Sequence, residues 1–221
     1  MSPLMVRAPV KPVACNNEHM KIGPKFKIAK RLGAPIFEKT QTQKFALSEA
    51  RGGRQNRRRP GNMSDYKRQL LEKQKMRYTY GVSEKQLRKY VNEAVAKSHQ
   101  PISLLVTRLE SRLDNVIYRM GLAKTRQQAR QLAAHGHFTV NGKRLTIPSH
   151  KVKIGDVVAI REGSKNIGLL TNIQDEHSAQ AVPGWLKFDL KQLSGEMIGT
   201  PTYEPSETMF DAAQVLEYYS R

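Results

Sequence analysis

The chain has 221 residues, a length that allows one large domain or two small ones. Its 38 Lys and Arg residues outnumber 19 Asp and Glu residues, and the net charge of +19 indicates a polyanionic partner, either nucleic acid or an anionic membrane surface. A single cysteine, Cys15, excludes an intramolecular disulfide and suits a reducing, intracellular compartment, and no apolar run is long enough to cross a membrane, so we expect no membrane partner.

The positive charge lies in the first two thirds of the chain. Residues 1–153 contain 33 basic and 9 acidic residues, whereas residues 154–221 contain 5 basic and 10 acidic residues. A phosphate-binding surface is therefore expected within residues 1–153. The acidic last third could face a basic protein neighbour instead.

The N-terminal part shows little regular pattern. Residues 1–45 lack helical and strand periodicity, so a basic extended arm is predicted there. From Arg51 to Asn62 the chain has five arginines and no apolar side chain, so this segment cannot pack a core. It is open to two interpretations, a solvated linker or a phosphate-binding loop, and the arginine density favours the loop.

A helical domain is predicted over residues 46–108. Ser64 can cap its first long helix, which extends to about Tyr78. Ser83 begins a second helix, and Gln86 completes a capping-box pattern. The first helix is predicted to bury Tyr66, Leu70 and Leu71, and the second to bury the stripe Leu87, Tyr90, Val91, Ala94 and Val95.

Residues 109–175 are predicted to form a small α+β unit. Two short helices begin with capping-box patterns, Ser111 with Asp114 and Thr125 with Gln128. The period then changes to two around Asn141-Gly142, a strong signal for a hairpin turn. We assign Leu145 and Ile147 to the returning strand, and Val157 to Ile160 to a further strand.

The last part of the chain is predicted to contain a candidate helix from Ser164 to about Gln174 and then a β-hairpin and acidic loop region over residues 176–206. The hairpin is expected to turn near Ser194-Gly195. A closing helix from Asp211 to Tyr219, within residues 207–221, could pack on the helical domain.

The window from Lys124 to Lys153 contains many basic residues and no acidic residue. Arg126 and Arg130 are spaced i, i+4, so both are predicted to project from one side of their helix. Guanidinium groups and helix N-terminal amides both suit phosphate oxygens. An ordinary solvated face is the alternative, and the absence of acids favours nucleic-acid contact.

The predicted RNA-binding residues are mostly basic and lie in three groups. The arm and the arginine-rich segment provide Lys25, Lys27, Lys30, Arg31, Arg51, Arg54, Arg57, Arg58 and Arg59. The helical domain provides Arg68, Lys85, Arg88 and Lys89. The α+β unit provides Arg112, Lys124, Thr125, Arg126, Gln127, Arg130, His135, His137, Asn141, Lys143, Arg144, Ser149, His150 and Lys151.

No catalytic pattern stands out. The sequence has no P-loop, no G-x-S-x-G nucleophile elbow and no zinc-deaminase motif. His135 and His137 have neither a cysteine nor a carboxylate between them, which disfavours a metal site. We predict no enzyme activity, no metal, no other cofactor and no small-molecule substrate.

Several runs resemble the RNA-binding module named after ribosomal protein four of the small subunit. They are Leu109 to Gly121, Thr125 to Leu132, His135 to Gly142, Ile147 to Ser149 and Gly155 to Val158. The flanks resemble the bacterial type of the same ribosomal family in Gly23-Pro24-Lys25, Ser64-Asp65-Tyr66, Tyr80-Gly81-Val82, Trp185-Leu186 and Glu217 to Arg221. The resemblance covers nearly the whole chain, although residues 1–20 and 39–62 depart from the family pattern.

The resemblance implies an α+β fold, in which an N-terminal helical domain precedes a small helix-helix-hairpin module of the alpha-L type and a C-terminal β-hairpin and helix. It also implies a structural constituent of the small ribosomal subunit that binds small-subunit (16S) rRNA as a primary binder, at a multi-helix junction of the 5′ domain. Such proteins nucleate assembly of the subunit body, influence translational accuracy and contact ribosomal proteins five and three. The protein's own mRNA is a further candidate partner that the sequence leaves open.

Some family members hold zinc in an N-terminal cysteine cluster, but this chain has only Cys15, so no zinc is expected. The expected location is the cytoplasm, on the bacterial ribosome, and an organellar origin stays open although nothing resembles a transit peptide. An RNA-modifying enzyme bearing the same module is the alternative function. It would need a catalytic domain, and residues 162–221 are too few and too poor in paired acids or nucleophiles.

Overall fold

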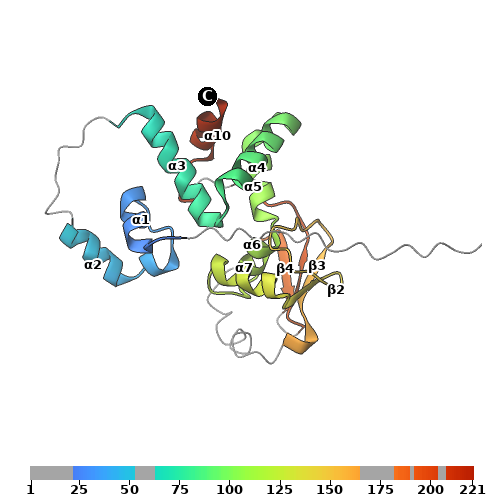
Figure 1. The fold of residues 1–221 in the computed structure, drawn as a ribbon. Helices are drawn as coiled ribbons and strands as arrows, with labels where there is room; N and C mark the ends of the chain where they lie inside the picture. Colours follow the sequence, from blue (N-terminus) through green and yellow to red (C-terminus); the bar gives the residue numbers. More distant parts are fainter. Residues whose placement is uncertain (1–21, 53–62, 165–181, 190–191, 204–207) are drawn as a thin grey trace, which may run out of the picture.

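A computed structural model describes residues 22–52, 63–164, 182–189, 192–203 and 208–221. Helices form one end of the molecule, and two helices with a five-stranded antiparallel sheet form the other (Figure 1). Among the described residues, each of these two parts has a hydrophobic core of its own. The predicted α+β fold class is therefore confirmed.

Three helices occupy most of residues 25–52, so the prediction of an extended arm is wrong for its described part. The elements are α1 (Lys25–Leu32), the 3₁₀ helix η1 (Glu38–Thr40) and α2 (Gln43–Gly52), which carries Arg51. They lie on the side of α3 away from α4 (Figure 1). The rings of Phe26 and Phe45 pack with their centroids 5.4 Å apart. Phe26, Ala29 and Leu32 recur at helical spacing along α1, and Ala29 and Leu32 are buried, so a short helical period was present and was missed.

The helical domain consists of α3 (Asp65–Tyr80), α4 (Glu84–Lys97), α5 (Pro101–Glu110) and α10 (Ala212–Ser220). The N-caps agree with the sequence, because the Oγ atoms of Ser64 and Ser83 accept hydrogen bonds from the third residue beyond each cap. Its core includes Met76, Leu87 and Val215. Figure 1 shows α10 between α3 and α4, so the C-terminus closes a domain that begins far earlier in the chain.

Two apolar residues of this domain were assigned to the wrong side. Tyr66 is 51% exposed and Val95 is 60% exposed, although both were predicted to be buried. The inward face of α3 carries Lys73, Met76 and Tyr80 instead. Tyr66 packs on the ring of Tyr218 in α10.

The module begins with α6 (Leu113–Arg119) and α7 (Arg126–His135). Its strands are β1 (Phe138–Val140), β2 (Lys143–Arg144), β3 (Val157–Ile160), β4 (Leu186–Asp189) and β5 (Ser194–Met197), with the 3₁₀ helix η2 (Glu162–Ser164) after β3. The strand order is β2-β1-β3-β5-β4. Asn141 and Gly142 have φ values of 51° and 76°, as a two-residue hairpin turn requires. The returning strand is shorter than predicted, because β2 ends before Leu145.

The C-terminal hairpin belongs to the same sheet as the module. β5 pairs with β3, so the described part of residues 176–206 does not form a separate unit. Ser194 and Gly195 are the start of β5 and not the turn. A Cβ at Gly195 would lie 2.6 Å from Met120 Cε, so this glycine permits close packing inside the strand. The candidate helix from Ser164 to Gln174 lies almost wholly outside the described residues.

None of the described helices has the length and apolar character that a membrane crossing requires.

Candidate nucleic-acid interface

A buried cluster of charged and polar side chains joins the helical domain to the module. Arg112 is fully buried, and its Nε and Nη2 atoms donate to the two carboxylate oxygens of Asp114 at 3.0 and 2.7 Å. Its Nη1 atom donates to the hydroxyl of Tyr90 in α4 at 2.9 Å. Burial lowers the pKa of Arg112, but the charge and hydrogen bonds of Asp114 outweigh burial and leave that pKa raised. The guanidinium therefore stays charged inside the protein.

This cluster corrects two predictions. Arg112, and not Ser111, is the N-cap residue of α6, and the Ser111 hydroxyl donates to the carbonyl of Arg108. Asp114 is consequently an ion-pair partner rather than part of a capping box. Because Arg112 is inaccessible and its donors face Asp114 and Tyr90, we remove it from the predicted RNA-binding residues.

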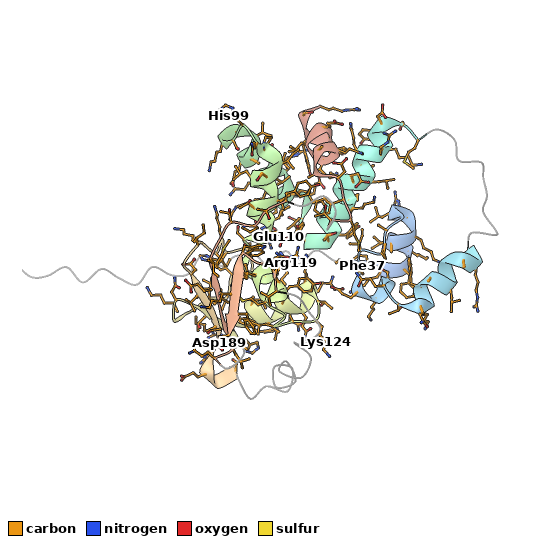
Figure 2. All side chains as sticks on the ribbon, turned by 180° about the vertical axis from the view of Figure 1, so that it is seen from behind. Phe37, His99, Glu110, Arg119, Lys124 and Asp189 are labelled. Atoms are coloured by element: carbon orange, nitrogen blue, oxygen red, sulfur yellow. The ribbon has the colours of Figure 1, made fainter. Side chains whose placement is uncertain are left out.

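Glu110 belongs to the same buried cluster, which we call the polar junction between the two domains. Its carboxylate accepts hydrogen bonds from Tyr80 Oη at 2.7 Å, from Asn115 Nδ2 at 2.6 Å and from two nitrogens of Arg119 at 3.0 Å each. Figure 2 shows Glu110 and Arg119 between the helical part and the sheet part. Burial raises the pKa of Glu110, but the hydrogen bonds and charge of Arg119, with the charge of Arg126, outweigh burial and lower it overall. The ionised carboxylate thus connects α3, α5 and α6.

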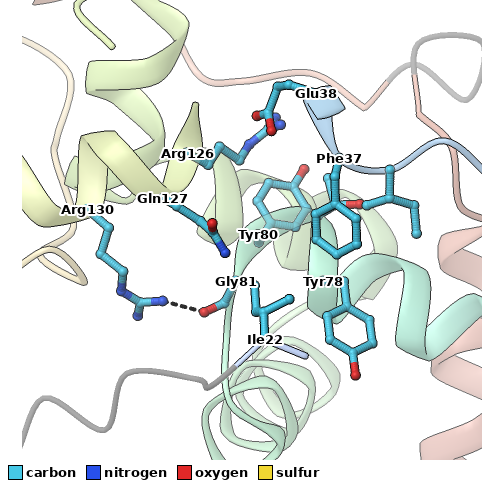
Figure 3. Close-up of a pocket in the computed structure, with 11 residues that line it drawn as sticks. Ile22, Phe37, Glu38, Tyr78, Tyr80, Gly81, Arg126, Gln127 and Arg130 are labelled. Carbon is cyan, nitrogen blue, oxygen red and sulfur yellow. Dashed lines mark hydrogen bonds between the residues drawn. The ribbon is translucent and has the colours of Figure 1, made fainter. Parts of the chain in front are cut away.

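Arg126 and Arg130 lie on one side of α7, as their spacing predicts, and that side faces the helical domain. Arg126 Nε donates to Asn115 Oδ1 at 2.8 Å, and its guanidinium carbon lies 4.4 Å from the ring centroid of Tyr118. Arg130 donates to the carbonyl of Gly81 (Figure 3). Both residues are half-buried, so they hold α7 against the end of α3 and have less freedom to reach RNA than the sequence suggested.

The N-terminus of α7 is formed locally. Thr125 Oγ1 accepts from the backbone N–H of Gln128 at 3.1 Å, as the capping pattern predicts. The Gln128 side chain accepts from the backbone N–H of Lys124 at 3.0 Å. The cap places Lys124 and Gln127 on the exposed surface at the start of the helix.

The predicted RNA-binding residues of the module that reach its surface come from α7 and its N-terminus, from the β1–β2 hairpin and from the loop between β2 and β3. The exposed ones are Lys124, Gln127, His135, Asn141, Lys143, Arg144 and Lys151, and the half-buried ones are Thr125, His137, Ser149 and His150. The side chains of Lys143 and Lys151 have no hydrogen-bond or ion-pair partner among the described residues. They are therefore free to bind phosphate.

Some polar side chains here make hydrogen bonds within the protein that stabilise the hairpin. Asn141 Nδ2 donates to Asp156 at 2.8 Å, and its Oδ1 accepts from the backbone N–H of Val157 at 2.9 Å, so the amide fixes the hairpin to β3. Arg144 donates to the carbonyl of His135 at 3.1 Å. Burial lowers the pKa of His137, and the nearby His135 lowers it further.

The helical part adds further exposed basic groups. Lys27, Lys30, Arg31, Arg51, Arg68, Lys85, Arg88 and Lys89 are exposed, and Lys25 is half-buried. Lys30 Nζ donates to Ser48, and Arg68 pairs with Asp65 at 3.3 Å, so these two are partly engaged within the protein. The predicted residues Arg54, Arg57, Arg58 and Arg59 lie outside the described residues. Within the described part of the chain, no three His, Cys, Asp or Glu side chains gather as a metal ion would require.

Two family descriptions match this chain. Residues 20–111 match the Ribosomal protein S4/S9 N-terminal domain, and residues 111–158 match the S4 domain. A Roseiflexus castenholzii protein named small ribosomal subunit protein uS4 is 42% identical over 204 residues, covering 90% of this chain and 98% of that protein. Proteins of the same name from Persephonella marina and Thermus thermophilus are each 38% identical over the same shares of the two chains. The chain belongs to the uS4 family.

The two uS4 family matches meet at residue 111, inside the buried cluster of Glu110, Arg112 and Asp114. The polar junction thus lies at the boundary between the two uS4 domains. Sequence analysis missed Glu110 and Arg119 as functional residues. The available signal was the position of Glu110 on the apolar face of α5, beside Leu109 and four residues after Val106, where an acid must have a buried partner.

Proposed function

We propose that this uS4-family protein is a structural, rRNA-binding component of the small ribosomal subunit and not an enzyme. The observation that carries this proposal is the set of exposed basic side chains on α7, the β1–β2 hairpin and the following loop, including Lys143 and Lys151, on a module joined to the helical domain by the Glu110–Arg119 ion pair and the Arg112–Tyr90 hydrogen bond. The names of the relatives support it. A pre-oriented basic surface suits recognition of a folded RNA by shape and phosphate position.

The proposal extends to a role in assembly. The protein would act as a primary binder of 16S rRNA at a multi-helix junction of the 5′ domain, nucleating the subunit body and influencing translational accuracy. Ribosomal proteins five and three are its proposed protein neighbours, its own mRNA is a further proposed partner, and the bacterial cytoplasm is its proposed location. No zinc or other cofactor is needed, since Cys15 alone cannot supply a structural zinc site.

Salt dependence of RNA binding tests the phosphate contacts. We expect the full chain to bind purified small-subunit rRNA without other ribosomal proteins, with an affinity that falls as salt rises. In a Lys143→Ala and Lys151→Ala double variant, the slope of log affinity against log salt should decrease by about two, because each lysine that binds a phosphate adds roughly one unit to the slope.

Lys187→Ala provides the matched control, because Lys187 is exposed on β4 within the acidic last third of the chain. Its slope should equal that of the wild type. An unchanged slope in the double variant would place the phosphate contacts elsewhere. Binding that appears only after other ribosomal proteins are added would contradict the role of a primary binder.

A further inference from the structure

A small cleft of about 140 Å³ lies where three segments of the chain meet (Figure 3). The start of η1 contributes Glu38 and the preceding Phe37, the end of α3 contributes residues 78–81, and α7 contributes Arg126, Gln127 and Arg130. Ligand pockets for drug-sized molecules usually measure about 300–1,000 Å³. The cleft is thus too small for a whole cofactor but suits a single planar ring.

Contacts between distant residues hold the walls of the cleft in place. Lys25 Nζ donates to Gln127 Oε1 at 2.9 Å, which fastens α1 to α7 across 102 positions of sequence. Arg130 donates to the carbonyl of Gly81, which fastens α7 to the end of α3. The rings of Phe37 and Tyr78 meet edge to face with their centroids 6.1 Å apart. The cleft is therefore formed before any ligand arrives.

The lining combines aromatic rings with hydrogen-bonding groups, the combination that proteins use to hold an unstacked base of RNA. Tyr78, Tyr80 and Phe37 supply the rings, and the guanidinium of Arg126 lies 5.3 Å from the ring centroid of Tyr80. Gln127 adds an amide at the edge of the cleft. In Figure 3 the side chains of Arg126 and Gln127 extend from α7 towards Tyr80 and the η1 segment.

Glu38 decides which part of a nucleotide the cleft suits. Its carboxylate lines the cleft, and it has no hydrogen-bond or ion-pair partner for its side chain among the described residues. The guanidinium groups of Arg126 and Arg130 also line the cleft, but they donate to Asn115 and Gly81 within the protein. The Glu38 carboxylate would repel a phosphate, whereas it would accept hydrogens from the amino or imino groups on the edge of a base. The cleft therefore favours a base over the RNA backbone.

We propose that this cleft between η1, α3 and α7 receives one unpaired base of small-subunit rRNA, a base that donates amino or imino hydrogens to Glu38. The inference rests on the proposed rRNA binding and adds a defined site to it. A base held there would contact the N-terminal helices, the helical domain and the module at once. It would thus couple the three parts of the protein when RNA binds.

Two substitutions on different walls of the cleft test the proposal in the full-length protein with purified small-subunit rRNA. Glu38→Gln removes the charge with little change of shape, and Gln127→Ala removes the amide. Each should weaken binding about tenfold, the reduction expected when one base contact is removed. Chemical probing of the Watson–Crick edges should show the same single nucleotide protected by the wild type and reactive in both variants.

Matched controls separate a site effect from a general one. Gln131 is exposed one turn further along α7, and Glu196 is an exposed acid on β5, so Gln131→Ala and Glu196→Gln serve as controls. Both should bind and protect like the wild type. Tighter binding by Glu38→Gln would identify a phosphate as the occupant and overturn the proposal. Unchanged affinity and an unchanged protection pattern in both cleft variants would overturn it as well, whereas no binding by the wild type would refute the proposed function itself.

Discussion

Replacing Glu110 with glutamine tests whether the buried junction holds the two domains together. Glu110→Gln keeps the shape of the side chain and removes its charge. The amide would place an NH₂ group opposite one of the donor sets, either Tyr80 with one Arg119 nitrogen or Asn115 with the other. At least one donor pair would then face another donor, and Arg119 would lose its counter-ion.

The structure sets the size of the effect. Glu110 has a side-chain exposure of 5%, so water cannot replace the lost interactions there, whereas the Arg119 side chain is 30% exposed and water can partly solvate it. Breaking a buried ion pair costs about 3–5 kcal/mol, and the exposure of Arg119 places the expected loss at the lower end, about 3 kcal/mol. For a chain of this length, that loss lowers the melting temperature by about 6–12 °C.

Thermal unfolding followed by circular dichroism measures this loss, with Glu162→Gln as a control at an exposed acid in η2. Arg119→Met completes a double-mutant cycle, and the double variant should be about 1–3 kcal/mol more stable than the sum of the two single losses predicts. If Glu110→Gln melts at the same temperature as the control, the junction contributes no stability and the reasoning fails.

Three further predictions concern pH, a glycine and a cap. Folding lowers the pKa of Glu110 below its ordinary value of 4.5. The ionised carboxylate therefore stabilises the folded protein fully above pH 4.5, and this stabilisation is lost as the pH falls through the pKa of the folded state. In urea titrations, the difference in unfolding free energy between the wild type and Glu110→Gln should become smaller over that lower pH range. Gly136→Ala and Gly142→Ala should each cost about 1–2 kcal/mol, since both glycines have positive φ, and the two losses should be similar because the methyl group at position 136 would displace only the flexible end of the exposed Arg144 side chain. A much larger loss at Gly136 would show that Arg144 cannot move aside. Thr125→Ala should lower the stability by about 1 kcal/mol and Thr125→Ser should restore it; a full loss in the serine variant would show that the cap is not responsible.

The parts of the fold that sequence predicts well depend on neighbouring residues. The turn at Asn141-Gly142 follows from the tolerance of these residue types for positive φ. The helix starts after Ser64 and Thr125 follow from side chains that bond backbone N–H groups three residues away. Each pattern involves a few adjacent positions, so it can be recognised without knowing the rest of the structure.

The candidate site depends on residues far apart in the chain, and here sequence reasoning was partly wrong. Arg126 and Arg130 were correctly predicted to share one side of α7. The sequence could not show whether that side faces solvent or the helical domain. Arg130 meets Gly81 across 49 positions, and Tyr80 meets Glu110 across 30. Since helical spacing says nothing about the neighbouring domain, it could not show that this side faces inward.

Local patterns in the sequence predict a basic, α+β, RNA-binding chain, because charge balance, helix caps and hairpin turns are properties of single residues and their near neighbours. Only the tertiary structure showed that residues 111 to 161 do not act alone. Their sheet is completed by β4 and β5, Arg112 donates to Tyr90 of α4, and Glu110 accepts from Tyr80 of α3. Arg112 and Arg119 find their acidic partners nearby in the sequence, but buried polar groups need further hydrogen-bond partners, and the packing of distant segments places those.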